Sequence, residues 1–255
     1  MTERAHRLAV LIDADNASAA IAADLMAEIA KLGTASVKRI YGDFTSPRLQ
    51  AWNGKILEHS IQQVQQPSFT AGKNASDIAL VIDAMDLLHS KRFEGFCLVS
   101  SDSDFTRLAM RLREEGATVY GFGEKKTPRA FVAACDKFIY TEILRPPSRA
   151  PARTKAATAK PTVRPAGKKR GQSSSGEPPL DVLRDAIDAS VDESGWAHLG
   201  QVGRVLSNRL PDFDARNFGF RSTGAMLDEL DGFEVRREGA AGGQQTVLVR
   251  VKTDI

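Results

Sequence analysis

Acidic residues flank three apolar runs in the first half of the chain. Asp13 and Asn16 follow the run 8–12, Asp77 precedes the run 78–82, and Asp102 and Asp104 follow the run 96–100. Carboxylates near an apolar core cost free energy unless they are paired or bound to a cation. Oxygen ligands suit Mg²⁺ or Mn²⁺, and such ions support phosphate chemistry. The pattern therefore predicts a divalent-metal site.

Each acid taken alone also fits the N-cap of a helix. Asp104 could be a fourth metal ligand or the cap of the helix that begins near Phe105, and Asn16 could add a neutral oxygen ligand or orient a water. Three independent caps need not share one edge of a sheet, so the joint pattern favours the metal site.

The elements that must position these acids alternate along the chain up to about Leu144. Strands are predicted over 8–12, 37–41, 96–100, 117–122 and 138–143, and apolar residues recur at helical spacing over 21–32, 78–88 and 105–112. This alternation predicts an α/β fold, a parallel sheet sandwiched by helices. Ligands of such sheets bind beyond the carboxyl ends of the strands, where Asp13 and Asp102 should lie.

Charge divides the chain into three parts. Residues 1–144 carry a net −1, residues 145–176 carry +9 with no acidic residue, and residues 177–255 carry −5. The middle part is rich in Pro, Ala, Ser, Lys and Arg and has almost no large apolar residue, so it cannot offset the entropy of ordering. We predict domains over 1–144 and 179–255, joined by a basic disordered linker over 145–178.

The last part has the pattern of a small α+β domain. Helices are predicted near 180–187, over 199–210 and over 223–230, followed by strands over 233–237 and 245–251 with a Gly-rich turn between them. Helices followed by a hairpin predict a winged helix-turn-helix. Arg204, Arg209, Arg216 and Arg221 could form a local basic face on it, although the net −5 keeps a protein partner open.

Composition is that of an ordinary globular protein, with 42% hydrophobic and 26% charged residues. Two cysteines, Cys97 and Cys135, cannot build a disulfide scaffold. No apolar run approaches membrane-spanning length, and the first residues lack the apolar core of a signal peptide. We therefore expect a cytoplasmic location and no membrane association.

Residues 7–144 resemble an NYN domain, of the PIN-like ribonuclease superfamily and its LabA-like members. The resemblance rests on Ile12-Asp13-x-x-Asn16, Ser76-Asp77 and Ser100-Ser101-Asp102-Ser103-Asp104-Phe105, with Cys135-Asp136-Lys137-Phe138 near the end. It implies a Mg²⁺- or Mn²⁺-dependent ribonuclease. Asp13, Asp77 and Asp102 would be the metal-binding acids, supported by Asn16 and by Asp104 as a further ligand. Asp15 is outside the motif, and Asp136 fits packing or capping better than catalysis.

Three basic residues near the expected strand ends could hold the RNA backbone. Lys73 lies in a loop four residues before Asp77, and Lys126 and Arg129 follow the strand predicted over 117–122. Contacts with phosphates would give affinity without sequence information. Charged loops are also commonly just solvated.

Residues 180–252 resemble an OST-HTH (LOTUS) domain, which implies RNA binding. The resemblance rests on Trp196-Ala-His-Leu-Gly200, on Pro211-Asp-Phe-Asp214 with Phe218-Gly-Phe220, and on the two closing strands. The whole chain is then expected to be a ribonuclease, an endonuclease rather than an exonuclease, with a C-terminal RNA-binding or targeting module. The sequence leaves open whether the protein forms a homodimer.

Two other functions compete with the ribonuclease. The same fold could serve as a non-catalytic RNA-binding adaptor or regulator, because metal binding can persist without turnover. Asp13-Ala14-Asp15 also resembles the DxD of a haloacid-dehalogenase-type phosphatase, but that family would want Thr or Val where Ala17 stands.

Overall fold

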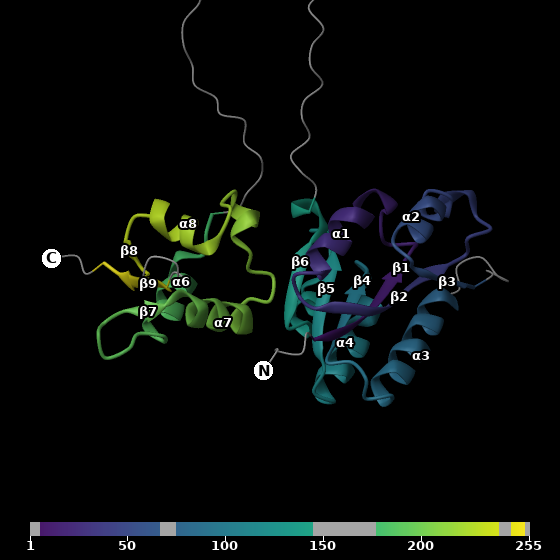
Figure 1. Cartoon of the computed structure of the whole chain (residues 1–255), viewed down its shortest axis with the longest axis horizontal. Helices are drawn as coiled ribbons and strands as arrows, with labels where there is room; N and C mark the ends of the chain where they lie inside the picture. The colour runs from purple at the N-terminus through teal and green to yellow at the C-terminus, as the bar shows by residue number, and fades with distance from the viewer. Residues whose placement is uncertain (1–5, 67–74, 145–176, 240–245, 253–255) are drawn as a thin grey trace, which may run out of the picture.

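The protein folds as two units that lie side by side (Figure 1). The computed structural model describes residues 6–66, 75–144, 177–239 and 246–252. The described part of the first unit ends at Leu144, and that of the second begins at Glu177. The predicted linker, apart from residues 177 and 178, therefore lies outside the described residues.

The first unit is built on a six-stranded sheet in the order β3-β2-β1-β4-β5-β6. Every neighbouring pair is parallel, which confirms the predicted α/β class. The chain runs outward from β1 to β3 and then returns to the other side of β1 with β4, so strand order reverses between β1 and β4. The strands are β1 (Arg7–Asp13), β2 (Thr34–Gly42), β3 (Gln62–Gln65), β4 (Gly95–Val99), β5 (Thr118–Gly123) and β6 (Lys137–Tyr140).

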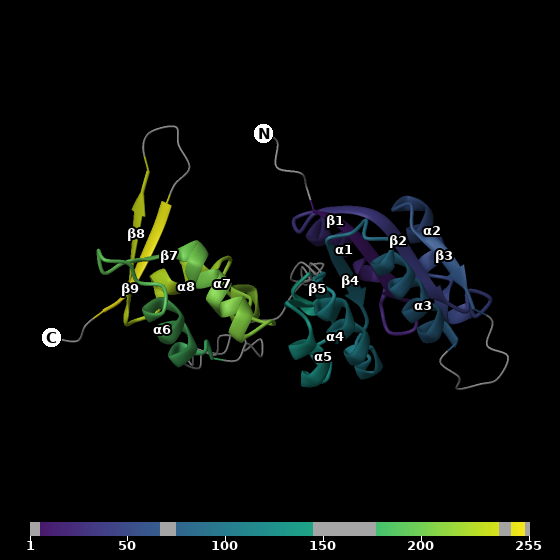
Figure 2. The ribbon, with the colours of Figure 1, turned by 90° about the horizontal axis from the view of Figure 1, so that it is seen from below.

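Helices cover both faces of this sheet. They are α1 (Ala22–Ile29), α2 (Trp52–Glu58), α3 (Ala75–His89), α4 (Thr106–Glu114) and α5 (Arg129–Ala134), with 3₁₀ turns η1 (Ala19–Ile21), η2 (Pro47–Leu49), η3 (Ser103–Phe105) and η4 (Thr141–Ile143). Figure 2 shows α3, α4 and α5 on the face of the sheet turned toward the viewer. None of the helices in the described ranges is long and apolar enough to cross a bilayer.

Strand β1 supplies both layers of the core. Val10 and Ile12 pack in the cluster that contains α1 and α2, whereas Ala9 and Leu11 pack in the cluster that contains α3, α4 and α5. This alternation is the two-residue period of a strand, and a strand buried on both faces is apolar throughout. All six residues from Leu8 to Asp13 are buried.

Two edge strands differ from the sequence-based expectation. Strand β3 was not predicted, because Gln-Gln-Val-Gln has no apolar alternation and lies at the exposed edge of the sheet. Strand β6 ends at Tyr140 rather than at residue 143, because residues 141–143 turn into η4. Strands at edges carry a weak apolar signal, since only part of their surface faces the core.

The second unit is a small helix and antiparallel-sheet domain, as predicted for a winged helix-turn-helix. Its core joins all three helices to the sheet. The sheet order β7-β9-β8 places the long hairpin beside a two-residue strand. The elements are α6 (Leu180–Asp188), β7 (Ala197–His198), α7 (Leu199–Arg209), η5 (Ala215–Phe218), α8 (Thr223–Glu229), β8 (Phe233–Glu238) and β9 (Thr246–Val251).

The segment between α7 and η5 contacts the open edge of β6. The backbone N–H of Phe138 donates to the carbonyl of Pro211 over 2.7 Å. The Asp212 carboxylate accepts from Arg129 at 2.6 Å and from the hydroxyl of Tyr140 at 2.9 Å. Backbone groups on an edge strand otherwise point to solvent, so this segment covers part of the edge.

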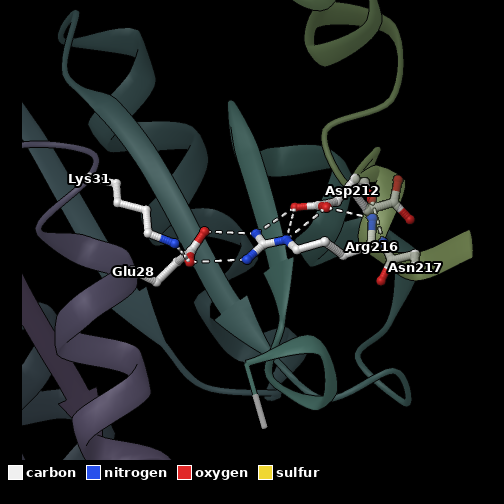
Figure 3. Close-up of polar contacts among 6 residues, drawn as sticks. Glu28, Lys31, Asp212, Arg216 and Asn217 are labelled. Atoms are coloured by element: carbon white, nitrogen blue, oxygen red, sulfur yellow. Dashed lines mark hydrogen bonds and ion pairs between the residues drawn. The ribbon is translucent and has the colours of Figure 1, made fainter. Parts of the chain in front are cut away.

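A second contact between the units is an ion pair to α1. Arg216 donates from Nη2 to Glu28 Oε1 at 2.7 Å and from Nη1 to Glu28 Oε2 at 3.1 Å (Figure 3). Asp214 holds the same guanidinium at 2.6 Å, and Lys31 adds a second cation beside Glu28 at 2.7 Å. The hydrogen bonds from Arg216 hold the pKa of the buried Glu28 at about 2.

Candidate active site

The candidate site lies at the carboxyl ends of β1 and β4, where strand order reverses. Ile12 of β1 is in register with Val99 of β4, so Asp13 and Ser100 follow at neighbouring positions. Ligands of doubly wound α/β sheets bind at such a point. The structure therefore brings the first and third acidic clusters together, as the sequence predicted.

Asp13 is the most deeply buried acid of the site, with 1% of its surface exposed. Its Oδ2 accepts from the hydroxyl of Ser100 at 2.7 Å and from the Asn16 amide at 2.8 Å. Its Oδ1 accepts from the backbone N–H groups of Asp15 and Asn16 at 3.1 and 3.3 Å. Burial raises the pKa of Asp13, while the bonds from Ser100 and Asn16 oppose that rise.

Ser100 belongs to the motif that carries the resemblance, but no role in the site was predicted for it from the sequence. Its hydroxyl donates to Asp13 Oδ2 and accepts from the backbone N–H of Asp102 at 3.0 Å. The side chain is therefore a direct link between the two acidic clusters, and Ser100 is only 2% exposed. The available signal was a polar residue at the end of an apolar strand, next to a buried acid on the neighbouring strand.

Asp102 caps the helical segment that follows β4. Its Oδ1 accepts from the backbone N–H of Asp104 at 2.9 Å, at the start of η3. The cap of this segment is therefore Asp102 and not Asp104, which the sequence had offered as a possible cap. Asp104 is an exposed residue in the first turn of η3.

Asp77 comes from a third element, the first turn of α3. The pKa of Asp77 is raised to about 6, first by burial and then by the negative charges of Asp13, Asp102, Asp15 and Asp104. A carboxyl shifted in this way lies within electrostatic reach of the other acids, because like charges disfavour its ionised form. Acids of all three predicted clusters therefore interact electrostatically with one another through Asp77.

The donor set fits a hard divalent cation in its chemistry. Carboxylate oxygens and one amide oxygen are ligands that Mg²⁺ and Mn²⁺ accept, and a cation would relieve the repulsion that raises the pKa of Asp77. Within the described ranges, however, no three His, Cys, Asp or Glu side chains come close enough together to hold a metal ion. Coordination would therefore require the carboxylates to draw together.

The predicted backbone contacts have different positions. Lys73 lies outside the described residues. Lys126 is exposed and pairs with Glu124 at 2.9 Å, and Arg129 is exposed and pairs with Asp212 of the second unit at 2.6 Å. Lys126 and Arg129 therefore each have an acidic partner in this structure. Their role in binding RNA stays a prediction.

The second unit has a groove of about 850 Å³ between the N-terminal ends of α7 and α8 and the hairpin. Arg204, Arg221 and Arg237 line it. The basic face predicted from four arginines is wrong in part, because Arg209 pairs with an aspartate of α6 and Arg216 pairs with Glu28. Neither Arg209 nor Arg216 is among the residues that line the groove.

Asp136 has the structural role that the sequence favoured. Its Oδ2 accepts from the backbone N–H of Val119 at 2.8 Å, and its Oδ1 pairs with Arg113 at 2.9 Å. Both cysteines are free and buried. Asp136 and the two cysteines are therefore not part of the acidic cluster at β1 and β4.

Family models match both units. The model of the NYN domain matches residues 7–144, and the model of the OST-HTH/LOTUS domain matches residues 177–244. Among curated proteins, none matches this sequence.

Several solved structures are similar to parts of the chain. A protein of unknown function from Vibrio parahaemolyticus has 16% identity and a TM-score of 0.47, over 54% of this chain and 94% of that one. An uncharacterized protein from Nitrosomonas europaea has 24% identity and a TM-score of 0.31, over 38% and 95%. Residues 175–257 of a Chromobacterium violaceum protein have 31% identity and a TM-score of 0.26, over 32% and 87%.

Proposed function

Because the chain belongs to the family of NYN-domain proteins, which have a PIN-like nuclease-related fold, we propose that it is a Mg²⁺- or Mn²⁺-dependent ribonuclease. The proposal assigns catalysis to residues 1–144 and RNA binding or targeting to the OST-HTH/LOTUS domain in residues 179–255. Residues 145–178 would be the basic tether, which raises the concentration of one domain at the other's ligand. Endonucleolytic cleavage is the expected mode.

The observation that carries this proposal is the link between two acidic clusters at one edge of the sheet, where the Ser100 hydroxyl donates to Asp13 Oδ2 and accepts from the backbone N–H of Asp102. Asp77 comes from a third element, and burial together with the charges of Asp13 and Asp102 raises its pKa. Structural caps would not need to gather at one edge of the sheet. Clustered carboxylates with raised pKa values are typical of functional sites.

Asp13, Asp77, Asp102 and Asp104 would hold the cation, which when bound lowers the pKa of an attacking water and neutralises the leaving oxygen. The chain's own groups prepare the site. Ser100 and Asn16 donate to Asp13 Oδ2 and so fix the orientation of that carboxylate. Asp77 would take up a proton below about pH 6, which reduces the negative charge of the site.

A non-catalytic RNA-binding adaptor is the second candidate. The observation that favours it is the spacing of the acids, because no three of the described carboxylates stand at metal-holding distance. The charged residues could then serve only to shape a binding surface. This alternative keeps the same fold and the same RNA-binding module.

Cleavage of labelled RNA by the purified full chain separates the two candidates. The reaction is run with Mg²⁺, with Mn²⁺ and with EDTA, for the wild type and for Asp13→Asn and Asp102→Asn. A ribonuclease gives metal-dependent products that both variants lose, whereas an adaptor binds RNA and leaves it intact under every condition. RNA retention measured in the same samples shows whether binding survives.

A further inference from the structure

A small apolar pocket adjoins the candidate site on one side. It has a volume of about 250 Å³ and is lined by two acids of the site, Asp77 and Asp104, and by four apolar residues: Ile78, Val81, Ile82 and Phe105. Phe105 forms a buried wall, with 2% of its surface exposed. The pocket therefore joins charged and apolar walls at the edge of the acidic cluster.

The apolar wall of this pocket is exposed where a helix surface is normally polar. Ile78 is 60% exposed and Ile82 is 55% exposed, and both belong to α3. They are four residues apart, so they lie on one face of the helix about 6 Å from each other along its axis. Single exposed apolar residues are common on proteins, but these two are adjacent and contiguous with a pocket.

The acids restrict what can fill this pocket. An aliphatic side chain or a lipid tail placed here would remove water from Asp77 and Asp104 and offer no hydrogen bond in return, which costs free energy. A nucleotide is different, because the faces of its base are apolar while its edges carry hydrogen-bonding groups. Its phosphate is also joined to the base and would accompany it toward the acids.

We propose that the pocket formed by Ile78, Val81, Ile82 and Phe105 is a subsite for the nucleobase next to the phosphate that the acids engage. The base lies flat on Ile78 and Ile82, and the edge of the base faces Asp77 and Asp104. This proposal rests on the proposed function, since it takes RNA as the molecule that reaches the acids. It adds a positioning role for two residues outside the acidic motif.

The subsite sets the distance between the bound phosphate and Asp77, and it does not select the identity of the base. Asp77 and Ile78 are consecutive on α3, so a base held on Ile78 brings its own phosphate to a defined place beside Asp77. Apolar contact with the face of a base does not distinguish one base from another. We therefore expect discrimination against an abasic site and tolerance of base identity.

Photocrosslinking tests the subsite through binding rather than cleavage. The probe is a single-stranded oligouridylate with one 4-thiouridine, irradiated with the full chain in Ca²⁺, while a gel checks that the RNA stays intact. Trypsin releases residues 74–91 as one peptide that contains α3. We expect the crosslink in that peptide. The crosslink yield should fall by about fivefold or more in Ile78→Ser and in Ile82→Ser, because each substitution removes apolar surface that a base would cover.

Leu57→Ser is the matched control, because Leu57 is an 82% exposed apolar residue on α2. It should leave the crosslink unchanged, and an abasic residue in place of the neighbouring nucleotide should weaken binding to the wild type but not to Ile78→Ser. Crosslinks outside α3, or equal crosslinks in Ile78→Ser and Leu57→Ser, would overturn the proposal. So would a change in particle mass in Ile78→Ser with unchanged crosslinks, because the pocket would then be a protein interface.

The outcomes also separate this proposal from the proposed function. A crosslink to α3 in a protein that never cleaves RNA would leave the subsite standing and remove the nuclease. Metal-dependent cleavage without any crosslink to α3 would do the reverse.

Discussion

Replacing Ser100 by Ala tests the link between the two acidic clusters. The substitution removes the donor to the buried Asp13 carboxylate and the acceptor for the N–H of Asp102, at 2.7 and 3.0 Å. A buried hydrogen bond to a charged group contributes about 2 kcal/mol and a neutral one about 1 kcal/mol. We therefore expect Ser100→Ala to lower the free energy of unfolding by about 3 kcal/mol near neutral pH, because both bonds are lost.

The neighbouring serine provides the control. Ser101 is also buried, but its hydroxyl accepts from a neutral donor, the backbone N–H of Glu124, at 2.9 Å. Ser101→Ala should therefore cost about 1 kcal/mol. Denaturant unfolding gives the two free energies, and calorimetry should place the melting temperature of Ser100→Ala roughly 8 °C below that of Ser101→Ala.

The effect of Ser100→Ala should also depend on pH. Burial already raises the folded pKa of Asp13 above the ordinary value of an aspartate, and loss of the Ser100 bond should raise it further. A carboxyl with a raised folded pKa destabilises the fold at pH above that pKa, and the penalty disappears below the unfolded value. The excess cost of Ser100→Ala should thus be largest at high pH and shrink as pH falls. Equal and pH-independent losses in the two variants would refute the reasoning.

Three further predictions concern the metal, the contact between the units and the groove. Binding of Mg²⁺ or Mn²⁺, measured by calorimetry, should weaken as pH falls through about 6, because protons then compete for Asp77. Arg216→Ala should raise the pKa of Glu28 from about 2 and increase the radius of gyration measured by X-ray scattering, because the paired contact is lost. Arg204→Ala and Arg221→Ala should each weaken RNA binding and reduce its salt dependence by about one phosphate contact.

Each of these predictions has a matched control. Asp86→Asn removes an exposed acid of α3 far from its first turn and should leave metal binding unchanged. Arg209→Ala removes an arginine of α7 that neither lines the groove nor pairs with Glu28. It is therefore the control for the scattering experiment and for the RNA-binding experiment. Metal affinity that does not change across this pH range, a constant radius of gyration, or equal RNA binding in Arg204→Ala and Arg209→Ala would each contradict the corresponding prediction.

The sequence predicted the sheet, and the positions of Asp13 and Asp102 at its carboxyl edge, because both depend on local patterns. That Asp13, Asp77 and Asp102 together bind a cation stays a prediction, since no three described carboxylates lie at metal-holding distance. The run Leu8–Ile12 is apolar throughout, as in a strand buried on both faces, and Asp13 follows it directly. Parallel strands end at one edge, so Asp13 and Asp102 had to meet there once the sheet was recognised. Asp77 was placed by its position at the start of an apolar helix.

What the sequence did not predict depends on contacts between distant residues. Strand β3 is polar and exists because it pairs with β2, which no local pattern of Gln62–Gln65 reveals. The role of Ser100 requires the register between β1 and β4. Arg216 was grouped with other arginines by its charge, but its partner Glu28 lies 188 positions away in the sequence.

Single-turnover cleavage by two aspartate variants of the same helix tests the central claim most directly. Asp77 and Asp86 both belong to α3, but only Asp77 lies in its first turn, within the field of the other acids. In Mg²⁺ or Mn²⁺ the account predicts that Asp77→Asn abolishes RNA cleavage while Asp86→Asn cleaves at the rate of the wild type. Cleavage by Asp77→Asn at the rate of Asp86→Asn, or RNA left intact by the wild type, would contradict it.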